Sequence, residues 1–207
     1  MNRQTLSRIK IFALQAVVIF TLVLMGIGAS AQGKWYKLFN EQDLQGWTAK
    51  GNATWEVKDG ILTGEGGRGH LYAEPVMQNL EIVGEFKITD LGGGANSGLY
   101  FRANWPSDNP DGFPRGYEAQ ICHIQDAHTG WLWKPGKPTG KATALLSKDG
   151  EWLQLKVKAV GGHIQIWVNN ELVMSHHDDE YKSGKFAIQC HNTGMKVEMR
   201  SLKYRPL

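Results

Sequence analysis

From about residue 34 onward the sequence alternates between apolar and polar residues with a period of two, and helical periodicity is almost absent. The run 79–89 is the clearest example, because Leu80, Ile82 and Phe86 share one face while charged residues occupy the other. Turn residues interrupt the runs at short intervals, and Asp59-Gly60 predicts a two-residue hairpin turn. About ten short strands without β-α-β alternation predict an all-β fold, a two-sheet antiparallel sandwich.

The first 31 residues have a different composition. Three cations in residues 1–10 precede an uncharged stretch, 11–33, that contains the small-x-small site Ala29-Ser30-Ala31. This arrangement predicts a secretory signal peptide, residues 1–31, and therefore export to the periplasm or the exterior. The uncharged stretch is also long enough to cross a bilayer, for which about 20 residues suffice. An uncleaved membrane anchor is therefore the alternative.

Cleavage after Ala31 would leave residues 32–207, which we expect to form a single domain. The leader holds three of the 23 Lys and Arg and none of the 20 Asp and Glu, so residues 32–207 are neutral. We therefore expect no attraction to nucleic acid and, once the signal is removed, no stable membrane insertion. Cys122 and Cys190 lie on strands whose polar neighbours fall on unlike faces, which predicts two free, buried thiols.

Polar side chains collect on two short apolar runs within residues 92–133. Glu118 and Gln120 are two residues apart on an expected strand, so both point to one face. On the neighbouring run, Asn96 opens the strand and Arg102 is expected on the face of Tyr100. A carboxylate and a guanidinium that converge on one sheet face can hold a polyol through bidentate hydrogen bonds. The alternative for Glu118 is an ordinary solvated sheet face.

A second polar pair, Gln189 and His191, lies on the penultimate expected strand, where a sandwich interior would hold aliphatic residues. Histidine is the side chain best suited to exchange a proton near neutral pH, although a lone histidine is more often structural. Trp131 and Trp133 follow in a loop, and a loop tryptophan can stack on a sugar ring or pack in the core. We expect one of these two tryptophans to bind substrate, because they point the same way only if the segment is extended.

His123, Asp126 and His128 place nitrogen and oxygen ligands at short spacing on a loop edge, so they are the candidates for a divalent metal ion. Their spacing is not diagnostic of any one metal. The sequence lacks a Gly-x-Ser-x-Gly elbow, a phosphate-binding glycine loop that opens a helix, and a Cys-x-x-Cys pair. These absences argue against hydrolase-elbow, nucleotide-dependent and thiol-redox chemistry.

Short motifs distributed over residues 34–207 resemble, in their order and number, the 3-keto-disaccharide hydrolase domain family. The motifs that carry the resemblance are Leu38-Phe39-Asn40, Gly46-Trp47, Glu85-Phe86, Asn96-Ser97-Gly98, Phe101-Arg102, Tyr117-Glu118-Ala119-Gln120-Ile121, Gly150-Glu151-Trp152, Ile166-Trp167-Val168-Asn169 and Ile188-Gln189-x-His191. The resemblance implies a concanavalin A-like jelly roll, exported by bacteria, that acts on glycosides already oxidised to a ketone at C3.

A 3-keto group acidifies the hydrogen at C2, so a base can remove it and the C1 oxygen can leave by β-elimination before water adds back. Through the resemblance, Glu118 or His191 would be the base, and Arg102, Gln120 or a divalent cation would stabilise the enolate. Relatives often carry acidic residues after the Glu118 motif, whereas Cys122 and His123 follow here, which weakens the expectation of a metal. The alternative function is a non-catalytic, lectin-like module, because a sandwich supports binding as readily as chemistry.

Overall fold

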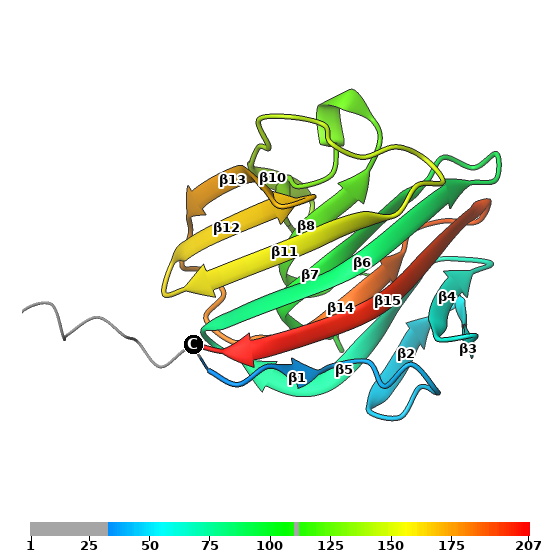
Figure 1. The fold of residues 1–207 in the computed structure, drawn as a ribbon, viewed down its shortest axis with the longest axis horizontal. Coiled ribbons are helices and arrows are strands. Elements are labelled where there is room, and N and C mark those ends of the chain that lie inside the picture. The colour runs from blue at the N-terminus through cyan, green and yellow to red at the C-terminus, as the bar shows by residue number, and fades with distance from the viewer. Residues whose placement is uncertain (1–32, 110–111) are drawn as a thin grey trace, which may run out of the picture. The chain divides into compact units, whose positions relative to one another are not determined.

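The structure is a computed structural model that describes residues 33–109 and 112–207. These residues form fifteen strands and one short 3-10 helix, η1 (Gln125–Ala127), in two antiparallel sheets that pack as layers (Figure 1). The prediction of an all-β, two-sheet antiparallel jelly-roll sandwich is confirmed. The described residues contain more strands than the ten or so expected.

The first sheet has eight strands in the order β13-β12-β11-β6-β15-β4-β3, with β1 paired to β15. Its strands are β1 (Tyr36–Lys37), β3 (Thr54–Lys58), β4 (Ile61–Glu65), β6 (Leu80–Asp90), β11 (Leu153–Val160), β12 (His163–Val168), β13 (Glu171–His177) and β15 (Met195–Pro206). The second sheet has seven strands in the order β10-β9-β8-β7-β14-β5-β2. Its strands are β2 (Trp47–Gly51), β5 (Gly69–Met77), β7 (Asn96–Asn104), β8 (Arg115–Cys122), β9 (Leu132–Lys134), β10 (Lys137–Gly140) and β14 (Gly184–Cys190).

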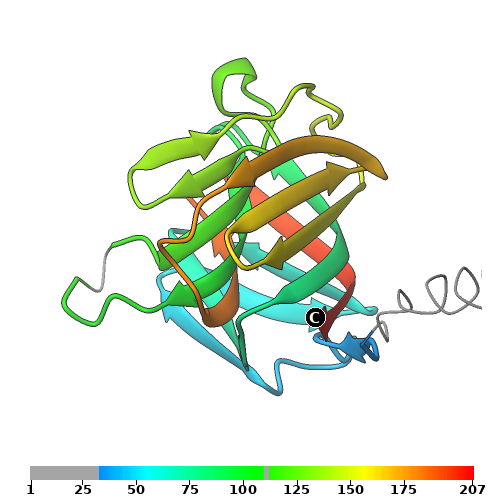
Figure 2. The same cartoon turned by 90° about the vertical axis from the view of Figure 1, so that its left-hand side faces the viewer.

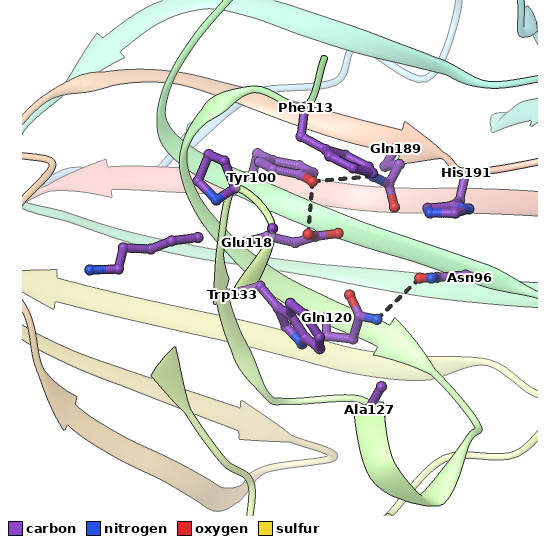
Figure 3. A pocket seen from close by; sticks show the side chains of 12 residues that line it. Asn96, Tyr100, Phe113, Glu118, Gln120, Ala127, Trp133, Gln189 and His191 are labelled. Carbon is purple, nitrogen blue, oxygen red and sulfur yellow. Dashed lines mark hydrogen bonds between the residues drawn. The ribbon is translucent and has the colours of Figure 1, made fainter. Parts of the chain in front are cut away.

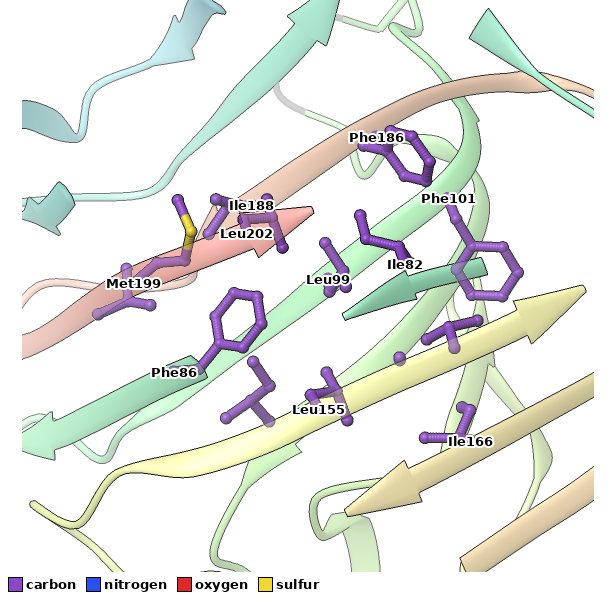
Figure 4. Close-up of a cluster of buried hydrophobic side chains, with 14 of the residues drawn as sticks. Ile82, Phe86, Leu99, Phe101, Leu155, Ile166, Phe186, Ile188, Met199 and Leu202 are labelled. Carbon is purple, nitrogen blue, oxygen red and sulfur yellow. The ribbon is translucent and has the colours of Figure 1, made fainter. Parts of the chain in front are cut away.

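The hydrophobic core lies between the two sheets (Figure 4). Ile82 and Phe86 of β6 are fully buried, as the alternation predicts, and they face side chains such as Leu99 and Ile188 from the second sheet. Burying each such side chain stabilises the fold by about 1.5–3 kcal/mol. Because the inward residues of the second sheet are committed to this core, their polar neighbours point away from it.

The structure confirms the predicted hairpin turn but also contains short strands that the sequence pattern did not predict. Asp59 and Gly60 have φ angles of 52° and 77°, as the predicted hairpin turn requires. Pro75 lies within β5, which continues through it to Met77. The register between β5 and β14 shifts at this point, so the missing N–H of the proline is tolerated. The short strands β2, β9 and β10 lack clean alternation and were not expected.

Both cysteines are buried and free, in agreement with the prediction. The expected signal peptide, residues 1–31, lies outside the described residues. In the part of the chain that the structure describes, no helix has the length and apolarity needed to span a bilayer.

Candidate active site

A pocket of about 250 Å³ opens on the face of the second sheet that points away from the core (Figure 3). Strands β7, β8, β9 and β14 form its floor, and the β7–β8 loop and the β9–β10 hairpin extend from the same side of the sheet (Figure 2). The pocket is lined by Asn96, Tyr100, Phe113, Glu118, Gln120, Ala127, Trp133, Lys134, Pro135, Gly136, Gln189 and His191. Six of these were predicted from sequence as site residues: Asn96, Glu118, Gln120, Trp133, Gln189 and His191.

Glu118 is buried in the floor of this pocket, directly opposite Tyr100 on β7. The Tyr100 hydroxyl donates a hydrogen bond of 2.7 Å to Glu118 Oε2. Glu118 Oε1 is also buried but has no hydrogen-bond partner among the described residues. Burial raises the pKa of Glu118 to about 8, although the hydrogen bond from Tyr100 acts in the opposite direction. At neutral pH the carboxyl group is therefore mostly protonated.

The hydrogen bond between Tyr100 and Glu118 is one link of a longer chain. Gln189 Nε2 donates to the Tyr100 hydroxyl at 3.1 Å and lies 3.3 Å from His70 Nε2. Because Tyr100 accepts from Gln189, its own proton is directed at Glu118 Oε2. A protonated Glu118 therefore carries its proton on Oε1, which lies on the side of the carboxyl group away from Tyr100 (Figure 3).

His70, at the end of this chain of hydrogen bonds, is neutral. Its pKa is lowered to about 3, first by burial and then by the nearby His191 and Arg68. A neutral imidazole can accept a hydrogen bond from Gln189, which fixes the orientation of the Gln189 amide and, through it, of the Tyr100 hydroxyl. His70 is thus a positioning residue, and it does not itself line this pocket.

His191 follows the last residue of β14 and lies at the end of the pocket opposite Tyr100 (Figure 3). Its ring stacks on Phe113 with centroids 5.8 Å apart and an interplanar angle of 25°. Burial lowers the pKa of His191, and the positive charge of Arg68 lowers it further, against a smaller effect of Asn192. The pocket therefore joins a carboxyl group whose pKa is raised to an imidazole whose pKa is lowered.

Amide and indole groups complete the pocket. Gln120 Nε2 donates to Asn96 Oδ1 at 3.1 Å, which holds both amides on the pocket wall. The Trp133 indole lines the pocket and stacks on Trp131, with centroids 6.5 Å apart. Lys134 is held by ion pairs of 2.7 Å to Asp178 and 2.6 Å to Glu180. These contacts fix the β9–β10 hairpin beside the sheet.

Arg102 and Trp131, which were predicted to bind substrate, do not line this pocket. A β-bulge follows Phe101, and Arg102 adopts a φ of 49°, so the alternation that would place it beside Tyr100 is broken. Its guanidinium donates instead to the backbone carbonyls of Gln78, Gly161 and Tyr181. Trp131 is buried behind Trp133, against the ring of His128.

The three predicted metal candidates are not gathered into a ligand set. His123 Nδ1 lies 3.2 Å from the Ser147 hydroxyl, Asp126 is exposed on η1, and His128 is buried against Trp131. Among the residues described, no three His, Cys, Asp or Glu side chains are arranged so that they could hold a metal ion. The residues present therefore do not fit the expected divalent ion.

Sequence reasoning missed four residues that shape the site: His70, Gly98, Tyr100 and Phe113. Gly98 leaves room for Glu118, because a Cβ atom there would lie 2.1 Å from Glu118 Oε1. The motif Asn96-Ser97-Gly98 was available as a signal, whereas the position of Tyr100 opposite Glu118 depends on the register between β7 and β8, which only the structure gives. Phe113 lies in an irregular loop, and nothing in the sequence pattern indicates that its ring reaches His191.

A hollow on one face of a β-sandwich, lined by a tryptophan, amides, a buried carboxyl group and an imidazole, is typical of proteins that bind or cleave carbohydrates. The model of the 3-keto-alpha-glucoside-1,2-lyase-like domain family matches residues 34–205. The chain therefore belongs to that family, and the resemblance seen in the sequence is confirmed. No curated protein matches the chain.

Solved structures with the same fold include both enzyme-like and binding proteins. A Parabacteroides distasonis protein named as a glycosyl hydrolase has a TM-score of 0.69 and 21% identity, covering 84% of this chain and 94% of its own. The carbohydrate-binding module CBM66 of Bacillus subtilis has a TM-score of 0.63 and 19% identity, covering 77% and 95%. The Emp46p carbohydrate recognition domain has a TM-score of 0.60 and 13% identity, covering 83% and 98%. At these identities the likeness shows the fold alone.

Proposed function

We propose that this protein is an exported enzyme that cleaves 3-keto-glycosides, including 3-keto-disaccharides, by elimination followed by hydration. The observation that carries the proposal is the pairing, in one pocket, of Glu118 with a raised pKa and His191 with a lowered pKa. Two titratable groups whose pKa values are displaced in opposite directions are the usual mark of an acid–base pair. Membership of the 3-keto-alpha-glucoside-1,2-lyase-like family supports this choice of substrate class.

The directions of the two pKa shifts support a division of roles that the sequence left open. Neutral His191 takes the proton from C2, which the adjacent ketone has acidified, and an enolate forms. The bond between C1 and the glycosidic oxygen then breaks, and the Oε1 proton of Glu118 passes to the leaving oxygen. In the second half, ionised Glu118 takes a proton from water as it adds to C1, and the His191 imidazolium returns a proton to C2.

The enolate oxygen requires hydrogen-bond donors that are already in place. The amides of Asn96 and Gln120 line the pocket and hold each other, so they are the groups we assign to this role. Trp133 supplies the apolar surface on which the sugar ring stacks. No step is assigned to a metal ion, and a chelator added to the assay tests that expectation separately.

Leaving-group dependence separates the acid from the base. Replacing Glu118 by Gln should lower kcat/KM for a 3-keto-disaccharide by about 10²–10⁴-fold, because the leaving sugar oxygen needs a proton. The same variant should lose less than about tenfold on 4-nitrophenyl 3-keto-glucoside, whose leaving phenolate needs none. His191→Asn should lose activity on both substrates, since both require removal of the C2 proton.

The pH profile gives a second readout. For the disaccharide, kcat/KM should fall as pH rises through about 8, where Glu118 loses its proton, and as pH falls through the lowered pKa of His191. Glu56→Gln and His163→Asn, both exposed on the first sheet, are the matched controls and should behave as the wild type. Equal losses of Glu118→Gln on the two substrates would contradict the acid role.

The second candidate function is carbohydrate binding without cleavage. The similarity of the fold to CBM66 and to a carbohydrate recognition domain favours it, as does a tryptophan in the pocket. Measurable binding of the keto sugar or its unoxidised parent, with no release of monosaccharide from either, would favour this function over the enzyme.

A further inference from the structure

A second pocket, of about 390 Å³, adjoins the first and shares His191 with it. It is lined by Gly51, Asn52, Arg68, Gly69, His70, Trp105, Gly112, His191, Asn192 and Thr193. Apart from His191 and His70, its lining residues have no assigned part in the chemistry of the first pocket. A ligand too long for the first pocket would extend past His191 into this one.

The wall between the two pockets is aromatic and positively charged. Phe113 stacks on His191 on one side, and the Arg68 guanidinium lies 5.5 Å from the Phe113 ring centroid. A second cation, Lys50, lies 5.8 Å from the ring of Trp105, which lines the second pocket. Among the described residues that line this pocket there is no Asp or Glu, so they place no negative charge beside Arg68.

The positive charge of Arg68 acts on the two histidines that lie where the pockets meet. It lowers the pKa values of both His70 and His191, after the larger effect of burial. Arg68 is exposed, so its guanidinium is accessible to a ligand and can bind a carboxylate through two parallel hydrogen bonds.

We propose that the second pocket receives the leaving group of the substrate and favours a leaving group that carries a carboxylate. This inference rests on the proposed function, because it places the keto sugar in the first pocket beside Glu118 and the bond to be broken near His191. The chemical class is therefore a 3-keto-glycoside of an acidic sugar or of another carboxylate-bearing alcohol or phenol.

The test compares 4-carboxyphenyl and 4-carbamoylphenyl 3-keto-glucosides, which have nearly the same shape and differ in charge. The intrinsic reactivity of each leaving group is the same for every enzyme variant, so it cancels when the ratio of kcat/KM values is compared between variants. Arg68→Gln should lower the carboxylate-to-amide ratio by about fivefold, the size expected of a partly exposed charge pair. Added salt should lower the wild-type ratio toward that of the variant.

Lys58→Gln, which removes an exposed charge from the first sheet, is the matched control and should leave the ratio unchanged. An unchanged ratio in Arg68→Gln, or an equal fall in the control, overturns the proposal. Calorimetric titration with the two unoxidised glucosides needs no turnover. If neither keto-glucoside is cleaved, the proposed function fails, and the titration still decides: an Arg68-dependent preference for the carboxylate supports the pocket, and equal affinities overturn it.

Discussion

At the scale of single residues, the site depends on how Glu118 is surrounded. One oxygen accepts a hydrogen bond from Tyr100, and the other is buried against Gly98 with no hydrogen-bond partner in the described part of the chain. A carboxyl group in such surroundings is held by packing and by one directional bond, so small displacements change what it can reach.

Gly98→Ala tests this packing. The added Cβ would lie 2.1 Å from Glu118 Oε1, so the carboxyl group must move. A displacement of about 1 Å in a catalytic group can cost about 10²-fold, and we expect kcat/KM to fall by that order. The thermal midpoint and the circular dichroism spectrum show whether the variant is folded. Wild-type activity in a folded variant would mean that Glu118 does not act from this position.

The raised pKa of Glu118 also has a consequence for stability. In the unfolded chain the carboxyl group has a pKa near 4.5, and in the folded protein near 8. Between these values the unfolded state releases its proton and the folded state does not, so stability is lost as pH rises from about 4.5 to about 8. Glu118→Gln removes this cost, which is on the order of 4–5 kcal/mol at pH 8.

We therefore expect Glu118→Gln to be more stable, relative to the wild type, at pH 8 than at pH 4.5. Urea unfolding of both proteins at the two pH values measures the difference. A stability difference that does not change with pH would show that Glu118 ionises normally in the folded state. The exposed control Glu56→Gln should show no such trend.

At the scale of elements, bulges decide which side chains reach the site. The bulge in β7 turns Arg102 away from Tyr100, and the buried guanidinium ties together three carbonyl groups from turns that are distant in sequence. Arg102 is 1% exposed, so its charge depends on these three carbonyls for hydrogen bonds.

Arg102→Met should lower the free energy of unfolding by about 3 kcal/mol or more, since it removes three hydrogen bonds made by a charged group. Activity per folded molecule, measured well below the melting temperature, should be close to that of the wild type. Arg115→Met, which removes an exposed ion pair with Asp108, should cost under about 1 kcal/mol. Loss of activity in Arg102→Met without loss of stability would instead indicate that Arg102 takes part in substrate binding or catalysis.

At the scale of the whole molecule, all lining residues of both pockets fall within the matched family domain. We expect a chain of residues 32–207 to unfold in one cooperative transition in urea and to retain the activity of the full chain. Exported material should begin at Gln32, as N-terminal sequencing would show. An N-terminus at Met1 or Asn2 would instead favour the uncleaved anchor.

Alternation and turn chemistry were enough to predict the fold class, the buried face of β6 and the Asp59-Gly60 hairpin, because each depends on neighbouring residues in one strand. They also placed Glu118 with Gln120, and Gln189 with His191, on common faces. Short strands such as β9 carry too few residues to show a period, so Trp133 could not be separated from Trp131.

The sequence alone determined a two-sheet sandwich with polar pairs on two of its strands, because strand periodicity is local and is written residue by residue. Only the tertiary structure decided that Glu118 and His191 share one pocket and that Arg102 does not. It did so because strand order and bulges are set by how the sheets pack, not by the pattern within a strand. The same packing buries Glu118, which raises its pKa. It also buries His191 and brings Arg68 toward it, and both effects lower the pKa of His191.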